Sequence, residues 1–399
     1  MVLSGGGELL RGSESSMRPT FLELFLDLVY VFALTRVSQR LVQDFAQPDD
    51  TSFTQALRAL VLLLTLWLLW TMTTLMTSRF DPERPAIQVV VVATMFASMV
   101  MAVAVPQAFE EHGPAFALAY VATQFGRPFF LGITLWGDPR QRISIRLVFW
   151  VLCTAPLWIA GAFTTGGTRL LLWCLALLGD YLGHALRWPT PRLGRSASVE
   201  WGLAGEHIAE RYQQFFLIAL GESILITGFA FSGGRFTPAT VTAFSIAFLT
   251  TVLLWRIYFF HAGFALAEAF SSARDQARFT WSATYTHLAI VAGVVTTAVG
   301  YELVIAHPYG ESAPPWIGVI IGGPLLFLAG RVRFGYEVFG RILWSRLVGI
   351  ALLILVAGPM VLLPPLAVAG TVSSILFGIA VHDVLRIRGR RRQVATSPL

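Results

Sequence analysis

The chain has 399 residues, of which 55% are hydrophobic and 13% are charged, and its mean hydropathy is +0.67. Soluble domains carry about 25% charged residues, so this composition excludes an ordinary soluble protein. The net charge of +6 does not indicate nucleic-acid binding, because all 29 basic residues are Arg and most lie between apolar runs. We therefore predict an all-α fold, a polytopic transmembrane helical bundle.

Twelve apolar runs recur along the chain, each long enough to cross the roughly 30 Å hydrocarbon core of a bilayer. Residues 1–19 precede them, lack the apolar run of a signal peptide and predict a flexible cytoplasmic tail. Pro359, Pro364 and Pro365 interrupt the last pair of runs, so eleven spans are the alternative count. The predicted spans lie at about 20–41, 56–77, 86–107, 114–136, 144–163, 168–188, 205–231, 238–263, 279–302, 315–330, 343–362 and 366–386.

The spans divide into two halves of six. The first half covers 20–188, a cytoplasmic linker covers 189–204, the second half covers 205–386, and a basic cytoplasmic tail covers 387–399. Glu23-x3-Asp27 opens the first span, and Glu210-x3-Gln214 opens the seventh. This echo suggests two six-helix parallel repeats about an axis along the membrane normal.

The distribution of Arg predicts the topology. Alternate connections are rich in Arg, whereas the others are nearly free of it and carry Asp49, Asp50, Glu110 and Glu111. Arg-rich loops stay in the cytoplasm, so we expect both termini inside and the chain in the cell inner (plasma) membrane, with anionic inner-leaflet lipids among its partners. The Arg-rich connections hold Arg79 and Arg84; Arg140, Arg142 and Arg146; Arg187, Arg192 and Arg195; Arg274 and Arg278; Arg331, Arg333 and Arg341; and the tail RIRGRRR at 386–392.

The seventh span, GEHIAERYQQFFLIALGESILITGFAF, carries a polar stripe. At 100° per residue, His207, Arg211, Gln214 and Glu222 fall within an arc of about 80°, and Glu210 lies about 60° to the side of His207. Charges are costly in hydrocarbon unless they are paired or hydrated. The stripe must therefore face other helices or water.

Other spans carry ionisable residues that suit this stripe. Asp180 and His184 are i,i+4 neighbours on the sixth span, and we expect Asp27 of the first span to face Arg211. In the predicted orientation nearly all of these groups lie in the cytoplasmic half of the membrane. We predict a cytoplasm-facing cavity that binds a small molecule or ion; the alternative is a set of buried ion pairs that only fix helix packing. The expected lining residues are Glu23, Asp27, Arg127, Asp180, His184, His207, Glu210, Arg211, Gln214, Glu222, Arg256 and His287.

Two motifs carry a resemblance to a known family. They are TFLELFLDLVYVFALTR, with Glu23 and Asp27, and EHIAERYQQFFLIALGESIL, with His207, Arg211 and Glu222. Together they resemble the bacterial low temperature requirement protein A (LtrA) family over residues 18–387. The resemblance implies a multi-spanning membrane protein of a family named for a cold-growth phenotype, and it implies no particular molecular activity. A looser similarity to two-repeat cation channels carries no function over, because Phe25-Leu26-Asp27 lacks their Ser.

The sequence contains no phosphate-binding loop, so primary pumping is not expected. A transporter or channel for a small ion or anionic solute is the favoured function. One alternative is an intramembrane enzyme that acts on a lipid-like substrate, with His207-x2-Glu210 and Asp180-x3-His184 as possible metal ligands; a non-catalytic membrane sensor is another. We expect no catalytic residues, metal or cofactor, and no CxxC chemistry at Cys153 and Cys174.

Overall fold

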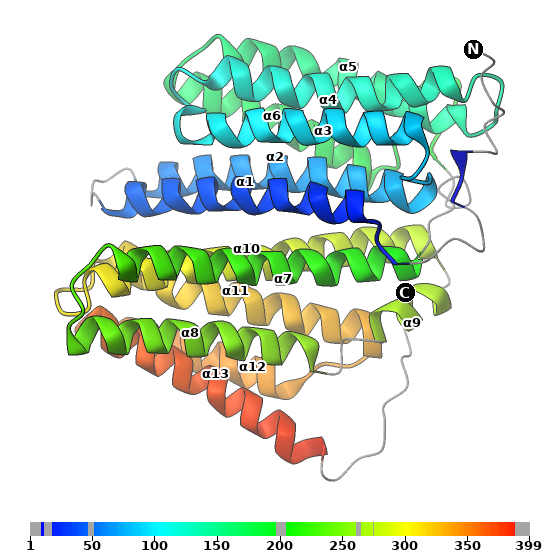
Figure 1. Cartoon of the computed structure of the whole chain (residues 1–399). Coiled ribbons are helices and arrows are strands. Elements are labelled where there is room, and N and C mark those ends of the chain that lie inside the picture. Colours follow the sequence, from blue (N-terminus) through cyan, green and yellow to red (C-terminus); the bar gives the residue numbers. More distant parts are fainter. Residues whose placement is uncertain are drawn as a thin grey trace. The chain divides into compact units, whose positions relative to one another are not determined.

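A computed structural model describes residues 9–11, 18–46, 52–196, 205–260, 265–273 and 275–387 (Figure 1). Helices dominate these residues, and the short 3-10 turn η2 (Val105–Gln107) follows α3. The α-helices are α1 (Phe21–Ala46), α2 (Ser52–Arg79), α3 (Pro85–Ala104), α4 (Gly113–Thr134), α5 (Gln141–Ala162), α6 (Gly166–Ala185), α7 (Gly205–Ser232), α8 (Pro238–Phe259), α9 (Ala265–Ser272), α10 (Gln276–Ala306), α11 (Pro314–Phe339), α12 (Trp344–Met360) and α13 (Pro365–Ile387).

The structure confirms a polytopic helical bundle, with a helix at each predicted span. By length and composition, 8 of the described helices suffice to cross a membrane: α2, α3, α5, α7, α8, α10, α11 and α13. The prolines near residues 359–365 made the number of spans uncertain. In the structure this region contains two separate helices, because α12 ends at Met360 and α13 begins at Pro365. Proline suits the first turn of a helix, where its missing N–H has no partner to lose.

The described residues differ from the prediction in several connections between spans, among them those after α8 and α11. The connection after α8 contains α9, whose 8 residues are too few to cross a bilayer and give no spanning signal. The Arg-rich connection after the tenth span begins later than expected, because α11 continues to Phe339 and ends at Gly340, which has φ 63°. Arg331 and Arg333 therefore lie within α11.

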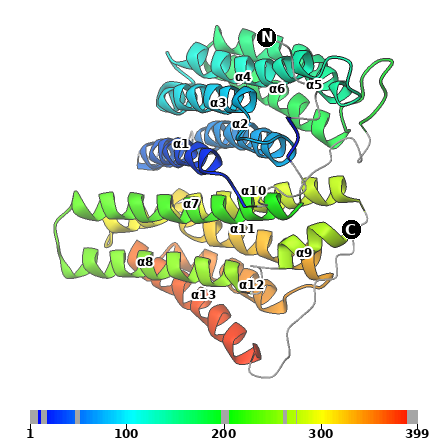
Figure 2. The ribbon, with the colours of Figure 1, turned by 45° about the vertical axis from the view of Figure 1, so that its right-hand side comes forward.

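The chain divides into two compact units. The first contains Met1–Val37 and Ala56–Ile208, and the second contains Ser38–Gln55 and Ala209–Leu399. In the first unit α3 packs on α4, α4 on α5, and α5 on α6, and these helices lie side by side in Figure 2. In the second unit α13 packs against α8, α11 and α12.

In the second unit, glycine permits the close approach of α10 and α11. A Cβ atom at Gly293 would lie 2.5 Å from the backbone N of Phe327, and one at Gly323 would lie 2.5 Å from the backbone N of Thr297. Small residues let helix backbones approach closely, which is how helices associate where lipid removes the hydrophobic driving force. These two glycines are therefore packing residues.

In the first unit, Arg169 joins two helix ends. Its guanidinium donates hydrogen bonds to the carbonyl oxygens of Gly161, Ala162 and Thr164 at the end of α5, and to those of Ala108 and Glu110. The last carbonyls of a helix lack partners within the helix and carry partial negative charge. Arg169 satisfies them and so fixes the turn between α5 and α6.

Candidate functional site

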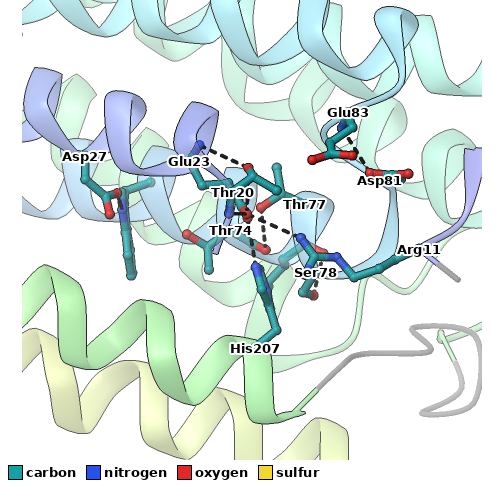
Figure 3. Close-up of polar contacts among 12 residues, drawn as sticks. Arg11, Thr20, Glu23, Asp27, Thr74, Thr77, Ser78, Asp81, Glu83 and His207 are labelled. Carbon is teal, nitrogen blue, oxygen red and sulfur yellow. Dashed lines mark hydrogen bonds and ion pairs between the residues drawn. The ribbon is translucent and has the colours of Figure 1, made fainter. Parts of the chain in front are cut away.

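Glu23 begins α1 as part of a capping box (Figure 3). The backbone N of Thr20 donates to Glu23 Oε2 (2.9 Å), and the backbone N of Glu23 donates to Thr20 Oγ1 (3.4 Å). The carboxylate also lies 3.0 Å from Nε2 of His207 and 3.3 Å from Nη2 of Arg11. All of these residues belong to the first unit.

These contacts explain how a fully buried carboxylate is tolerated at this helix end. Glu23 is 0% exposed, yet its carboxylate accepts a hydrogen bond from a backbone N–H and faces the side chains of Arg11 and His207. Arg11 is itself anchored, because its backbone N donates to the carbonyl of Arg79. The pattern Thr-x-x-Glu at 20–23 is the sequence signal of a capping box, and it indicates this role without any tertiary information.

Asp27, one turn further along α1, is also buried. Its Oδ1 accepts a hydrogen bond of 2.9 Å from Nε1 of Trp70 on α2. On the same helix, the hydroxyl of Tyr30 accepts a hydrogen bond of 3.1 Å from Ser98 on α3. Polar contacts therefore join α1 to two neighbours, and the expected pairing of Asp27 with Arg211 stays a prediction.

Asp180 of α6 is held by three donors from two other helices. It accepts hydrogen bonds from the hydroxyl of Tyr120 (2.8 Å), the hydroxyl of Thr154 (2.7 Å) and Nε1 of Trp158 (3.0 Å). The hydroxyl of Tyr120 in turn accepts from Nε2 of Gln124 (3.1 Å). Buried carboxylates need such a set of donors, and this set fixes the orientation of Asp180.

Arg127 of α4 extends this network. Its Nη2 donates to Oε1 of Gln124 (2.5 Å), and its Nη1 donates to Oγ1 of Thr73 on α2 (3.0 Å). The residue is 7% exposed and forms no ion pair with a carboxylate in the described part of the chain. A guanidinium has five N–H donors, so these two hydrogen bonds leave it with donors and charge to spare.

Arg127 lines two pockets in the first unit. One is also lined by Gln124, Asp180 and His184. The other is also lined by Arg79 and Arg140. The structure thus brings together three of the expected site residues, Arg127, Asp180 and His184, and adds Gln124, Thr73 and Tyr120, which the sequence analysis did not single out. We call this set of six residues the Arg127 site.

The remaining expected residues on α7 differ in burial. His207, Arg211 and Glu222 are buried, whereas Glu210 and Gln214 are half-buried. The buried carboxylate of Glu222 faces the hydroxyl of Ser38 and the carboxylate of Glu302 on α10, all in the second unit. A single cavity that contains all twelve expected residues stays a prediction.

His287 and Arg256 occupy aromatic surroundings in the second unit. The ring of His287 stacks on Tyr212 at a centroid distance of 4.5 Å, its Nδ1 lies 2.8 Å from the carbonyl oxygen of Ala283, and its Nε2 lies 3.0 Å from the hydroxyl of Tyr258. Both ring nitrogens are therefore engaged within the helix bundle. The guanidinium of Arg256 lies 4.1 Å from the ring centre of Phe260.

The second unit also contains buried charges that the sequence analysis placed elsewhere or passed over. Arg346 of α12 donates two hydrogen bonds to the carboxylate of Asp383 on α13, at 2.5 and 2.6 Å. Arg331 of α11 is 1% exposed, donates to the carbonyl of Ile257 and lies over the ring of Phe334. In the first unit, Arg146, expected in a connection, lies in α5 and donates to the carbonyl of Leu193.

Two further points concern the possible metal ligands and the residues outside the described part of the chain. Among the described residues, no group of three or more His, Cys, Asp or Glu is arranged to hold a metal ion. Asp49, Asp50, Arg274 and the basic tail from residue 388 lie outside the described residues.

Comparisons with known proteins give a family and a relative for this chain. The model of the bacterial low temperature requirement A protein (LtrA) family matches residues 18–381. The uncharacterized protein RA0937 of Rhizobium meliloti (strain 1021) is 34% identical over 392 residues, which cover 97% of this chain and 94% of that protein. No solved structure matches the chain.

Proposed function

Since the chain belongs to the bacterial low temperature requirement A (LtrA) family of multi-pass membrane proteins, we propose that it carries an anionic solute across the cell inner membrane through the Arg127 site. The proposal covers a transporter or a channel. It gives the Arg127 guanidinium the role of anion ligand and gives the Asp180 network the role of holding the site in shape.

The observation that carries the proposal is that Arg127 is buried and that no described residue pairs its guanidinium with a carboxylate. A charge removed from water loses several kcal/mol of solvation unless a counter-charge or hydrogen bonds replace it. Arg127 has hydrogen bonds to Thr73 and Gln124 but no counter-ion among the described residues. An anion in either adjacent pocket would supply that counter-charge.

The surroundings of Arg127 support passage as well as binding. Arg79 at the end of α2 and Arg140 at the start of α5 line the same pocket as Arg127. Arg127 lies seven residues, roughly 10 Å at 1.5 Å per residue, from the last residue of α4. The three guanidinium groups thus offer an anion successive ligands from a helix end toward the interior of the bundle.

The test is uptake into vesicles that contain the purified full chain, measured for chloride, phosphate and short-chain carboxylates. We expect Arg127→Gln to lower uptake of the transported anion by about tenfold or more, the effect of losing a charged hydrogen-bond donor. The matched control is Arg142→Gln, because Arg142 is exposed at the start of α5. Equal uptake by wild type and Arg127→Gln would remove the support for the proposal.

A further inference from the structure

An apolar groove of about 660 Å³ lies between α3 and α4 in the first unit. Phe96 of α3 and Phe130 of α4 line it and are 72% and 36% exposed. Small residues, such as Ala97 of α3 and Ala122 of α4, also line it. Both helices belong to the predicted spans, so the groove has the composition of a surface that contacts hydrocarbon. Apolar chains of lipid-like molecules are therefore its natural contents.

One polar group in the groove differs from the others. Apart from Thr94, Thr123 and Arg127, all residues that line the groove are apolar. Thr94 donates its hydroxyl to the carbonyl of Val90, and Thr123 donates to that of Ala119, so both are satisfied within their own helices. Arg127 is therefore the polar group of the groove whose N–H donors are not all used by hydrogen bonds to the described residues.

The position of Arg127 makes the groove amphipathic. Ala115 and Arg127 both line the groove and are twelve residues apart on α4, which corresponds to roughly 18 Å at 1.5 Å per residue. This length is close to half of the roughly 30 Å hydrocarbon core, and one acyl chain spans one such half. The groove therefore combines the length of a single acyl chain with a cation in its C-terminal part, and Arg127 also lines the polar pocket of the Arg127 site.

We propose that this groove binds a long-chain carboxylate, with its acyl chain between α3 and α4 and its carboxylate on Arg127. The inference rests on the proposed function, because it names a substrate class for the Arg127 site. A carboxylate matches the planar fork of a guanidinium and can accept two parallel hydrogen bonds from it. A phospholipid fits less well. Arg127 lies roughly 10 Å from the end of α4, so a phospholipid whose headgroup reached Arg127 would also have to place its glycerol and second acyl chain at that depth.

Gly126 provides a way to close the groove without disturbing the helix packing. It lines the groove beside Arg127, and a Cβ atom built on it would meet no atom within 4 Å. A larger side chain there would enter the groove rather than a neighbouring helix, and replacing an interior helix glycine also favours the helix. Gly318 of α11 is the matched control, because it is exposed and a Cβ there also meets nothing within 4 Å.

The experiment is photolabelling of the full chain in phosphatidylcholine vesicles. The probe is hexadecanoic acid with a diazirine near the middle of its chain, and the matched probe is the corresponding alcohol. We expect the acid to label peptides of α3 and α4 of the wild-type chain. We expect about tenfold less labelling when the alcohol replaces the acid on the wild-type chain, and about tenfold less labelling by the acid on Arg127→Gln and on Gly126→Leu. Gly318→Leu should label as wild type does.

Equal labelling by acid and alcohol, or unchanged labelling in Gly126→Leu, would overturn the inference. The probe comparison is made on the wild-type chain, so it stands even if a variant fails to fold. Uptake of short-chain carboxylates separates the two proposals. If uptake depends on Arg127 but labelling is not specific for the acid, the inference alone is overturned. If uptake does not depend on Arg127 and labelling is not specific for the acid, the proposed function is overturned as well.

Discussion

Nε2 of His207 lies 3.0 Å from Oε1 of Glu23, which ties the start of α7 to the start of α1. The same carboxylate contacts Arg11 and the backbone of Thr20. Glu23 therefore acts as an anchor for three segments of the first unit that are far apart in the sequence.

This anchor gives a stability prediction. Glu23→Gln keeps a residue that suits a capping box but removes the negative charge, so Arg11 and His207 lose the carboxylate that they face. We expect a loss of several kcal/mol of unfolding free energy, measured as a lower melting temperature in detergent. The control Glu206→Gln changes an exposed carboxylate at the start of the same α7 and should be nearly neutral. Equal melting temperatures for the two variants would contradict the anchoring role.

Glu222 gives a functional prediction. Its carboxylate is fully buried and has no cationic partner among the described residues, and such a group is suited to hold a proton or a cation. We expect Glu222→Gln to reduce vesicle uptake by about tenfold or more, in the range reported for loss of a charged partner, while Glu206→Gln keeps wild-type uptake. Equal effects of the two substitutions would mean that Glu222 has no coupling role.

Arg346 and Asp383 form a buried pair whose two members should respond unequally to substitution. Asp383→Asn leaves Arg346 buried without its carboxylate and close to a second buried cation, Arg331, whereas Arg346→Gln leaves the positive charge of Arg331 to offset Asp383 in part. We expect each single change to cost about 3–5 kcal/mol, with Asp383→Asn the more severe.

The double variant Arg346→Met/Asp383→Leu should cost less than the sum of the two single changes, because it leaves neither charge of the pair behind. Detergent denaturation of the four proteins measures this coupling. Additive losses would mean that the two residues do not interact.

Neighbouring glycines of α11 provide a packing test. Gly323→Ala would place a Cβ atom 2.5 Å from the backbone of Thr297, so α10 and α11 must separate, and we expect a loss of about 1–3 kcal/mol. At Gly322 a Cβ meets nothing within 4 Å, so Gly322→Ala should be neutral or stabilising by up to about 1 kcal/mol. Similar melting temperatures for both variants would contradict the close packing of these helices.

The predicted topology can be tested with cysteines in a background without Cys153 and Cys174. A cysteine at exposed Glu311, between α10 and α11, should react with an impermeant thiol reagent added outside intact cells. Cysteines at exposed Arg142 and in the basic tail should not react until the membrane is opened. Labelling of the tail from outside would place the C-terminus outside and require an odd number of spans.

The helices themselves follow from the sequence. By length and composition, 8 of the described helices suffice to cross a bilayer, and a chain in hydrocarbon must satisfy every backbone N–H and C=O internally, so such apolar runs form helices whatever surrounds them. The break between Met360 and Pro365 follows from proline in the same local way, and so does the capping box at Thr20 and Glu23. Local chemistry is sufficient for these features.

Which polar residues meet was decided by the tertiary structure. The i,i+4 spacing of Asp180 and His184 identifies a helix face, but only the packing of α4, α5 and α6 brings Tyr120, Thr154 and Trp158 to the Asp180 carboxylate. Likewise, nothing local to α4 indicates that Arg127 bonds Thr73 of α2 and forms no ion pair within the described chain. Helical period fixes directions around one axis, whereas contacts depend on the rotation and depth of each neighbouring helix, and those are set by side-chain packing across the whole unit.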